Sequence, residues 1–302
     1  MNSLGALQTG DRVALLSVSG PPASELLERA QTLLESWGLR VVIGDHLQSP
    51  HPRVNYLAGP DQGRADDLQK AWLDPQIAGI FLARGGYGAV RVLDLLDLSA
   101  LRAARPKPLF GSSDVTAIHE FWQQQFGLPT WFAPMVATRD LLDDPISTER
   151  LRQAIFTPYS GRSFSSPGAE SLVRGSARGT LTGGNLSLLC MTMGAHGERK
   201  LSNTGKIGLL EEVNEETYKI DGYLQNLLRA GWFDGMSGLA LGSWKNCAEL
   251  SEVRALCEEL LSPLGIPIIW ELGFGHGPAA HSLPLGLAAQ LIADDNPRLV
   301  MD

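Results

Sequence analysis

The sequence predicts an α/β protein in which a parallel-sheet domain of the flavodoxin or Rossmann type precedes a smaller α/β domain rich in β-structure. Short apolar runs alternate with helix-like stretches in the first half, which is the pattern of βαβ units. A Ser- and Gly-rich segment, 160–168, interrupts this pattern, and shorter strand-like runs follow it. Because 302 residues leave room for two domains, we expect them at 1–159 and 176–302, joined by a linker at 160–175.

The first half contains four apolar runs that we interpret as strands of the parallel sheet: Val13–Val18, Leu39–Ile43, Ile77–Ala83 and Pro108–Gly111. Between the first two, an apolar stripe at helical spacing predicts a helix with Ser24 as its cap and Gly38 as its stop. Ligands of such sheets bind at the carboxyl ends of the strands. The segments 84–88 and 111–114 should therefore lie on the functional edge.

The second half has a different pattern, with three short strand-like runs at Ile207–Leu210, Leu239–Gly242 and Pro267–Trp270. Gly183 and Gly184 are typical of a turn. Helical periodicity predicts three helices, at Asn185–Gly194, Ile220–Ala230 and Ser251–Leu261.

Charge and composition exclude several classes of function. Lys and Arg number 25 against 33 for Asp and Glu, a formal net charge of -8, so nucleic acid is not an expected partner. The longest apolar runs are far shorter than the ~20 residues that cross a bilayer, and the start of the chain does not resemble a secretory leader. The three cysteines of the chain form no C-x-x-C pair, which favours a reducing compartment. We expect a soluble, cytoplasmic protein without a membrane partner.

The first candidate for chemistry is the turn Gly111-Ser112-Ser113-Asp114, between an apolar strand and an amphipathic helix. A serine hydroxyl at such a corner can project into a site, and the amide that follows it can face a developing oxyanion. The alternative is a helix N-cap, for which Ser and Asp are favoured residues. Val115 stands where the G-x-S-x-G motif has its last glycine.

The second candidate is the loop Arg84-Gly85-Gly86-Tyr87-Gly88, directly after the third strand. Glycines let the backbone approach a ligand closely and present its amides to an anion. The loop matches neither phosphate-binding motif, so a nucleotide cofactor is not expected.

Acidic residues and histidines supply the remaining candidates. Glu211 and Glu212 end a strand-like run, where a carboxylate can orient a histidine, although such acids are also typical of a solvated helix start. His276 lies between glycines, and His281 follows five residues later. The H-x4-H spacing fits no helical zinc motif, so we expect no metal.

Taken together and in this order, these motifs resemble the LD-carboxypeptidase family, which includes murein tetrapeptide carboxypeptidases and microcin C7 self-immunity peptidases. The resemblance covers nearly the whole chain. Its blocks are Gly10–Val13 with Ser19–Pro21, Arg84–Gly88, Gly111–Asp114, Leu181–Leu186, Leu210–Val213, Tyr218–Asp221, and Gly275–His276 with Leu283–Gly286.

The resemblance implies a Ser-Glu-His triad formed by Ser113, Glu211 and His276, with the nucleophile in the first domain and the other two members in the second. Two departures from the family pattern occur. His281 stands where asparagine is expected, which leaves open a share in the imidazole chemistry. Phe132–Met135 replaces the usual His-Gly-Pro-Met in a pocket wall.

Further roles follow from the resemblance. The backbone amides of Asp114 and Gly86 would form the oxyanion hole. Arg84 and the amides of Gly85 and Gly86 could hold the terminal carboxylate of a peptide, or Arg84 could brace the two domains through an ion pair. Asn185 could face the substrate, or could only cap and pack a helix.

The resulting expectation is a serine carboxypeptidase that removes terminal D-Ala from cytoplasmic murein tetrapeptide in peptidoglycan recycling, without a cofactor. An immunity-type hydrolase of acyl-sulfamoyl-adenylate amides is the alternative, and Trp131, Trp232 and Trp244 are its candidates for stacking on adenine. A module that binds a small peptide or muropeptide without turnover is a third possibility. A homodimer is expected from the family.

Overall fold

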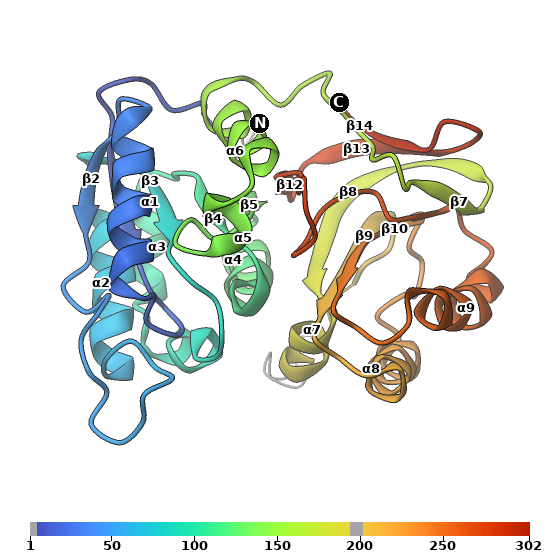
Figure 1. Cartoon of the computed structure of the whole chain (residues 1–302), viewed down its shortest axis with the longest axis horizontal. Helices are drawn as coiled ribbons and strands as arrows, with labels where there is room; N and C mark the ends of the chain where they lie inside the picture. The colour runs from blue at the N-terminus through green and yellow to red at the C-terminus, as the bar shows by residue number, and fades with distance from the viewer. Residues whose placement is uncertain (1–4, 194–201) are drawn as a thin grey trace. The chain divides into compact units, whose positions relative to one another are not determined.

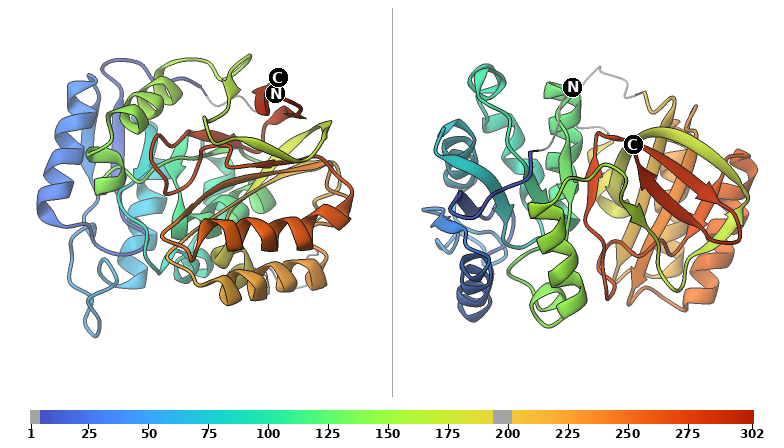
Figure 2. Two further views of the ribbon diagram at one scale, coloured as in Figure 1. Left: turned by 45° about the vertical axis from the view of Figure 1, so that its right-hand side comes forward. Right: turned by 90° about the horizontal axis from the view of Figure 1, so that it is seen from above.

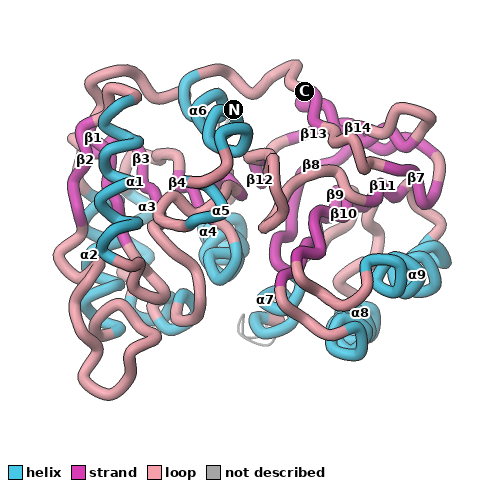
Figure 3. The backbone as a smooth tube through the Cα atoms, viewed as in Figure 1, coloured by secondary structure: helices cyan, strands magenta, loops and turns pink. Residues whose placement is uncertain are grey.

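A computed structural model describes residues 5–193 and 202–302. The chain divides into two compact units, Met1–Pro158 (unit 1) and Tyr159–Asp302 (unit 2). Figure 1 shows a separate sheet in each unit, and Figure 3 shows the helices that accompany each sheet.

Unit 1 contains a parallel sheet whose five strands pair in the order β2-β1-β3-β4-β5. The strands are β1 (Arg12–Leu16), β2 (Arg40–Ile43), β3 (Ile77–Leu82), β4 (Leu109–Gly111) and β5 (Thr130–Phe132). This order is that of flavodoxin-like folds, whose binding crevice lies at the carboxyl ends of β1 and β3. The fold class predicted from the sequence is confirmed, and the loops after β1 and β3 are placed at this crevice.

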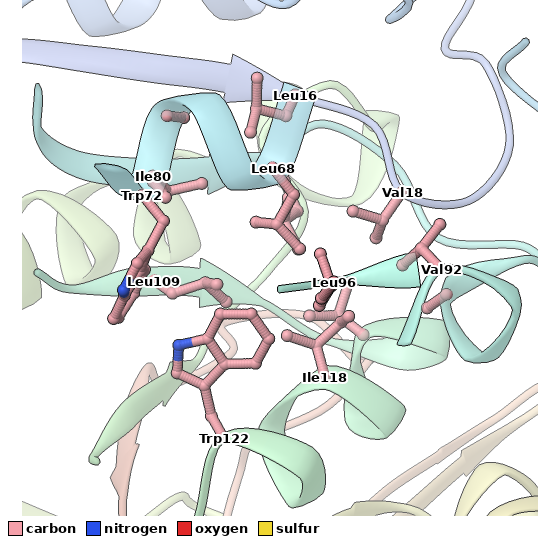
Figure 4. Packing of buried hydrophobic residues seen from close by; sticks show 14 of the residues in the cluster. Leu16, Val18, Leu68, Trp72, Ile80, Val92, Leu96, Leu109, Ile118 and Trp122 are labelled. Atoms are coloured by element: carbon pink, nitrogen blue, oxygen red, sulfur yellow. The ribbon is translucent and has the colours of Figure 1, made fainter. Parts of the chain in front are cut away.

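The helices of unit 1 are α1 (Ser24–Ser36), α2 (Asp61–Leu73), α3 (Leu98–Ala103), α4 (Thr116–Phe126), α5 (Arg139–Leu142) and α6 (Pro145–Phe156). Leu16 and Ile80 of the sheet, Trp72 of α2 and Trp122 of α4 all belong to one buried hydrophobic cluster (Figure 4). The two indole rings meet edge to face at 5.3 Å. The sheet is therefore anchored directly beside α4, the helix that follows Ser113.

Unit 2 contains an eight-stranded sheet in the order β6-β14-β13-β8-β9-β10-β11-β7. Its strands are β6 (Ser163–Phe164), β7 (Glu170–Val173), β8 (Gly175–Asn185), β9 (Lys206–Val213), β10 (Gly238–Lys245), β11 (Ile268–Trp270), β13 (Ala288–Ala293) and β14 (Arg298–Met301). The short strand β12 (Leu283–Leu285) is not part of this sheet. Strands β8 to β11 are parallel, and antiparallel strands flank them.

Among the described residues of unit 2, three helices contribute to its core: α7 (Leu186–Thr192), α8 (Thr217–Ala230) and α9 (Leu250–Leu261). Their apolar residues form one cluster with Leu210 of β9 and Leu241 of β10. Figure 2 shows α8 and α9 side by side. The predicted end of the first of these helices, Gly194, lies outside the described residues.

The segment 160–175, predicted to be a linker, instead supplies β6 and β7 to the sheet of unit 2. Its serines bond to backbone carbonyls of that unit: Ser165 Oγ to Pro297, Ser166 Oγ to Glu271 and Ser171 Oγ to Asp294. Hydroxyls that satisfy carbonyls in this way let a polar segment pack as an ordered edge.

β6 and β7 lie at opposite ends of the strand order, yet only residues 165–169 separate them. Outer strands of a flat eight-stranded sheet would be about 34 Å apart, whereas this connection spans at most about 20 Å. The sheet of unit 2 therefore curls until its two edges approach each other.

Gly183 and Gly184, predicted to form a turn, lie inside β8. Both have positive φ, 115° and 150°. A Cβ atom at Gly183 would lie 2.2 Å from the carbonyl oxygen of Leu209 in β9. Glycine is needed at position 183 because the backbones of β8 and β9 approach so closely there.

In the described ranges, none of the helices combines the length and the apolar character needed to cross a bilayer.

Candidate active site

Ser113 occupies a strained corner between β4 and α4. It begins a 3₁₀ turn, Ser113–Val115, and its φ of 58° is unusual for a residue with a side chain. Ser112 holds the N-cap position of this turn, but its side chain makes no capping hydrogen bond. The cap alternative is therefore not what the structure shows for Ser112, and the strain is concentrated on Ser113.

Two side chains hold the backbone of this corner through hydrogen bonds. Nε2–H of the fully buried His119 donates to the carbonyl of Gly111 at 2.9 Å, and the amide of Ser112 donates to Sδ of Met135 at 3.1 Å. Burial lowers the pKa of His119 to about 4, so its ring is neutral near pH 7.

The glycine-rich loop after β3 packs directly on Ser113. A Cβ atom at Gly85 would lie 2.9 Å from both Cβ and Oγ of Ser113, so only glycine fits. Gly86 follows with a φ of 107°. The amide of Gly20 donates to the carbonyl of Gly85 at 3.1 Å, and the exposed Arg84 donates through Nη1 to the carbonyl of Pro21 at 2.9 Å. The loops after β1 and β3 are thus joined.

Asp114 fastens the same loops through its buried carboxylate. Its Oδ2 accepts hydrogen bonds from the hydroxyl of Ser19 and from the amide of Ala89, the latter at 2.7 Å. Burial raises the pKa of Asp114 to about 6, although both hydrogen bonds oppose the shift. Within the described residues, Oδ1 has no hydrogen-bond partner.

Unit 2 brings Glu211 and His276 together. Glu211 is fully buried near the end of β9, and its Oε2 accepts a hydrogen bond from Nδ1 of His276 at 2.8 Å. Because the carboxylate oxygen is the acceptor in this hydrogen bond, Nδ1 carries the proton, and in the neutral ring Nε2 carries the lone pair. A Cβ atom at Gly275 would lie 2.6 Å from the same Oε2, which explains the glycine before the histidine.

Ser243, which the sequence analysis missed, holds the histidine loop. Its Oγ accepts from the amide of Gly277 at 2.8 Å, and its own amide donates to the carbonyl of Phe274 at 2.8 Å. The only sequence signal was its place, directly after the predicted strand Leu239–Gly242.

Asn185 lies beside Glu211 on the neighbouring strand β8 and is 1% exposed. Its Nδ2 donates to Oε1 of Glu211 at 3.2 Å and to Oε1 of Glu212 at 2.8 Å. Burial, followed by the charge of Glu211, raises the pKa of Glu212. The substrate contact expected for Asn185 stays a prediction, while its helix cap is observed.

His281 anchors the start of unit 2. Its Nε2 bonds to the carbonyl of Ser165 at 2.7 Å, and its ring meets Phe164 edge to face. Because a carbonyl only accepts, this nitrogen is protonated and cannot act as a base.

Within the described part of the chain, no group of three or more His, Cys, Asp or Glu is placed to hold a metal ion. Unit 1 gathers Ser113 with Gly85 and the amide of Asp114, and unit 2 gathers Glu211 with His276 and Asn185.

Three curated relatives extend over nearly the whole chain. A putative carboxypeptidase of Streptomyces coelicolor is 43% identical and covers 95% of this chain and 92% of its own. A probable murein peptide carboxypeptidase of Bacillus subtilis is 33% identical, with coverages of 95% and 90%. The murein tetrapeptide carboxypeptidase of Pseudomonas aeruginosa is 29% identical, with coverages of 93% and 92%.

Two solved structures share the fold. The muramoyltetrapeptide carboxypeptidase of Oxalobacter formigenes matches with a TM-score of 0.80 and 24% identity, over 95% of this chain and 97% of its own. The microcin C7 self-immunity protein MccF, in complex with aspartyl sulfamoyl adenosine, matches with a TM-score of 0.86 and 20% identity, over 99% and 98%. At these identities the likeness shows the fold alone.

Two family models match the chain, one in each unit. The LD-carboxypeptidase N-terminal domain matches residues 13–133, and the LD-carboxypeptidase C-terminal domain matches residues 178–291. Together with the relatives, these matches show that the chain belongs to the LD-carboxypeptidase family of serine peptidases.

Proposed function

We propose that this protein is a serine carboxypeptidase that hydrolyses the L,D-peptide bond to the terminal D-Ala of murein tetrapeptide during peptidoglycan recycling in the cytoplasm. The observation that carries the proposal is the buried Glu211, whose Oε2 fixes the proton of His276 on Nδ1. The strained corner at Ser113 supports it. The substrate class is suggested by the relatives named murein peptide and murein tetrapeptide carboxypeptidases.

In the proposed reaction, Nε2 of His276 takes the hydroxyl proton of Ser113 while Oγ attacks the scissile carbonyl carbon. Glu211 accepts the hydrogen bond from Nδ1–H and stabilises the imidazolium that forms. The amides of Asp114 and Gly86 stabilise the oxyanion. Gly85 supports this assignment, because its close packing holds the loop against the serine.

The imidazolium then protonates the leaving amine as the C–N bond breaks, which releases D-Ala and leaves an acyl-enzyme on Ser113. Water attacks the ester while Nε2 of His276 takes one of its protons. The returning proton restores the serine hydroxyl, and the shortened peptide leaves as a carboxylic acid.

Arg84 and the amides of Gly85 and Gly86 are proposed to bind the terminal carboxylate of the substrate. Arg84 is exposed, and its bond to the carbonyl of Pro21 holds the guanidinium beside the glycine-rich loop. A planar guanidinium can form two parallel hydrogen bonds to a carboxylate.

The acyl-sulfamoyl-adenylate alternative would need a surface for adenine. The three tryptophans considered for this role are all buried. Trp131 stacks on Phe110, Trp244 stacks on Trp270, and Trp232 packs edge to face on Phe233. These rings are occupied by packing, which favours the peptide substrate.

The decisive experiment incubates wild type, Ser113→Ala and Ser112→Ala with L-Ala-γ-D-Glu-meso-diaminopimelate-D-Ala and follows D-Ala release by chromatography. We expect Ser113→Ala to lose about 10⁴ to 10⁶ in kcat, and the neighbouring Ser112→Ala to keep at least about a tenth of the activity. Activity of Ser113→Ala within tenfold of wild type would refute the nucleophile.

Two further arms test the alternatives. Release of the amino acid from an aminoacyl sulfamoyl adenosine, without D-Ala release from the tetrapeptide, would replace the proposed substrate. Binding of the peptide without turnover, together with no labelling by a serine-directed fluorophosphonate, would indicate a binding module. A homodimer, also proposed, is tested by light scattering after gel filtration.

A further inference from the structure

Two neighbouring carboxylates of β9 converge on one amide group. Successive side chains of a strand normally point to opposite faces, yet Glu211 and Glu212 both accept a hydrogen bond from Nδ2 of Asn185, at 3.2 and 2.8 Å. Asn185 stands opposite Glu211 in the parallel pairing of β8 with β9. All three residues are at most 1% exposed. Their contacts are therefore made away from bulk water.

The amide of Asn185 can be oriented in only one way. Its Oδ1 accepts from the amide of Leu188 at 3.2 Å and from the hydroxyl of Ser187 at 2.8 Å. A flipped amide would turn its NH₂ group toward the Leu188 amide and its oxygen toward two carboxylates. The helix cap thus sets the direction in which Nδ2 donates.

Glu212 holds the other side of this arrangement. Its Oε2 accepts from the amide of Ser187 at 2.7 Å, and its Oε1 accepts from its neighbour Val213 at 2.9 Å as well as from Asn185. Its carboxylate is thereby fastened to the start of α7. Among the described residues, the ionisable groups that interact electrostatically with Glu212 include Glu211 of β9, Cys190 of α7, Tyr223 of α8 and Cys247 after β10.

The two oxygens of Glu211 have separate partners, since Oε1 accepts from Asn185 and Oε2 accepts from His276. We propose that Asn185 and Glu212 are positioning residues for the Glu211–His276 pair: the bridging amide prevents rotation of the Glu211 carboxylate and so keeps Nδ1–H of His276 on its acceptor. This inference rests on the proposed function. The terminal torsion of a glutamate is otherwise soft, and a fixed acceptor is what selects the tautomer of a catalytic histidine.

The test separates the bridge from the helix cap. Asn185→Ser keeps a favoured N-cap hydroxyl but removes Nδ2. Asn185→Asp keeps the cap and places a third carboxylate against the other two. The matched control is Asn203→Ser, since Asn203 is also buried in unit 2 and its Nδ2 donates to the carbonyl of Trp232. Thermal unfolding and circular dichroism compare the folding of all three variants.

The first readout is the rate at which a fluorophosphonate labels Ser113, measured from pH 5 to 9, because labelling needs no peptide substrate. We expect Asn185→Ser to label about 10 to 100 times more slowly than wild type, with a shifted pH profile, and Asn185→Asp more slowly still. With tetrapeptide, kcat should fall in proportion while KM stays within about twofold. Asn203→Ser should match wild type in labelling rate, pH profile, kcat and KM.

The outcomes distinguish this inference from the proposed function. If wild type itself is not labelled at Ser113, the proposed function fails. If wild type is labelled and Asn185→Ser has the same rate and pH profile, the positioning role is refuted while the proposed function stands. A rise in KM at unchanged kcat would show instead that Asn185 contacts substrate. If Asn185→Ser unfolds, Glu212→Gln carries the same labelling test, since it disturbs the bridge from the opposite end.

Discussion

The carboxylate of Asp114 accepts a hydrogen bond from the backbone amide of Ala89, which lies 25 residues earlier in the chain. The residue after the proposed nucleophile therefore fastens the end of the glycine-rich loop. Its second partner, Ser19, belongs to the segment that follows β1. One buried side chain thus ties together the exits of three parallel strands.

Asp114→Ala should loosen the glycine-rich loop and lower kcat by about 10- to 100-fold, because it leaves the amide of Ala89 without its acceptor. Asp114→Asn should keep kcat within about tenfold of wild type. The oxygen of Asn can accept both hydrogen bonds, and its NH₂ group would take the place of Oδ1. The measurement is D-Ala release under saturating tetrapeptide. Equal losses in the two variants would mean that the charge, rather than the loop contact, matters.

The pH dependence of stability should contain two opposing contributions from unit 1. Asp114 has a pKa of about 6 when folded, against 3.8 ordinarily. The folded chain therefore keeps a proton that the unfolded chain releases, and this contribution makes stability fall as pH rises from about 4 to 6. His119 has a pKa of about 4 when folded, against 6.5 ordinarily. Its contribution is complete above pH 6.5 and is lost as pH falls toward 4.

Urea midpoints measured across pH 4 to 7 test both signs. Each group changes the free energy of unfolding by roughly 3 kcal/mol over its full titration. The two changes have opposite signs and therefore largely cancel in wild type. Asp114→Asn should steepen the loss of stability toward acid, while His119→Gln should reduce it. A variant whose slope moves in the opposite direction would contradict the corresponding assignment.

Gly183→Ala should destabilise the protein by at least about 3 kcal/mol, because a Cβ atom would collide with the carbonyl of Leu209 and φ is 115°. Gly222→Ala is the matched control. Gly222 lies on the exposed side of α8, and no atom lies within 4 Å of the added Cβ. This variant should therefore raise the free energy of unfolding by about 0.5 to 1 kcal/mol. Urea unfolding compares the two, and an unchanged midpoint for Gly183→Ala would be incompatible with the strand contact.

Ser243→Ala should lower kcat by about 3- to 10-fold with little change in KM, since the amide of Gly277 loses its acceptor and the histidine loop is less well held. Ser237→Ala also removes a hydroxyl from unit 2, at the residue before β10, where it donates to the carbonyls of Arg178 and Lys206. That control should leave kcat unchanged. Steady-state kinetics on the tetrapeptide decide between them.

Arg84→Lys should raise KM for the tetrapeptide about tenfold while kcat changes less than about threefold, because an ammonium group cannot form paired hydrogen bonds with a carboxylate. Arg102→Lys is the control, since Arg102 likewise donates to a carbonyl, that of Gln125. An unchanged KM for Arg84→Lys would remove Arg84 from carboxylate binding.

In the parallel sheet of unit 1, strands β1, β3 and β4 could be predicted because they are buried on both faces and therefore appear as continuous apolar runs. The ends of the helices were harder to predict from the sequence. Ala23, not Ser24, holds the N-cap position of α1, and the hydroxyl of Ser24 instead accepts from Gln48. Local sequence favours a cap residue, but it does not show which distant donor competes for the hydroxyl.

The candidate site, too, could be predicted only in part from the sequence. Glu211 and His276 are 65 residues apart, and only their resemblance to a known pattern paired them. The contacts of Glu212 depend on how the end of β8 lies against β9, and those of Ser243 depend on how the histidine loop lies against β10. Residue types and spacing do not encode either arrangement. Gly183 could not be assigned to a strand from sequence, since its glycine is required by the backbone of another strand.

The segment that contributes β6 and β7 has a composition typical of a flexible tether, yet it covers β14 at one end of the curled sheet and β11 at the other. Unpaired strand edges are templates for association with other chains. Replacing 160–175 with a Gly-Ser stretch of equal length would uncover two such templates at once. The result would be aggregation, even though every residue of the candidate site remained in place.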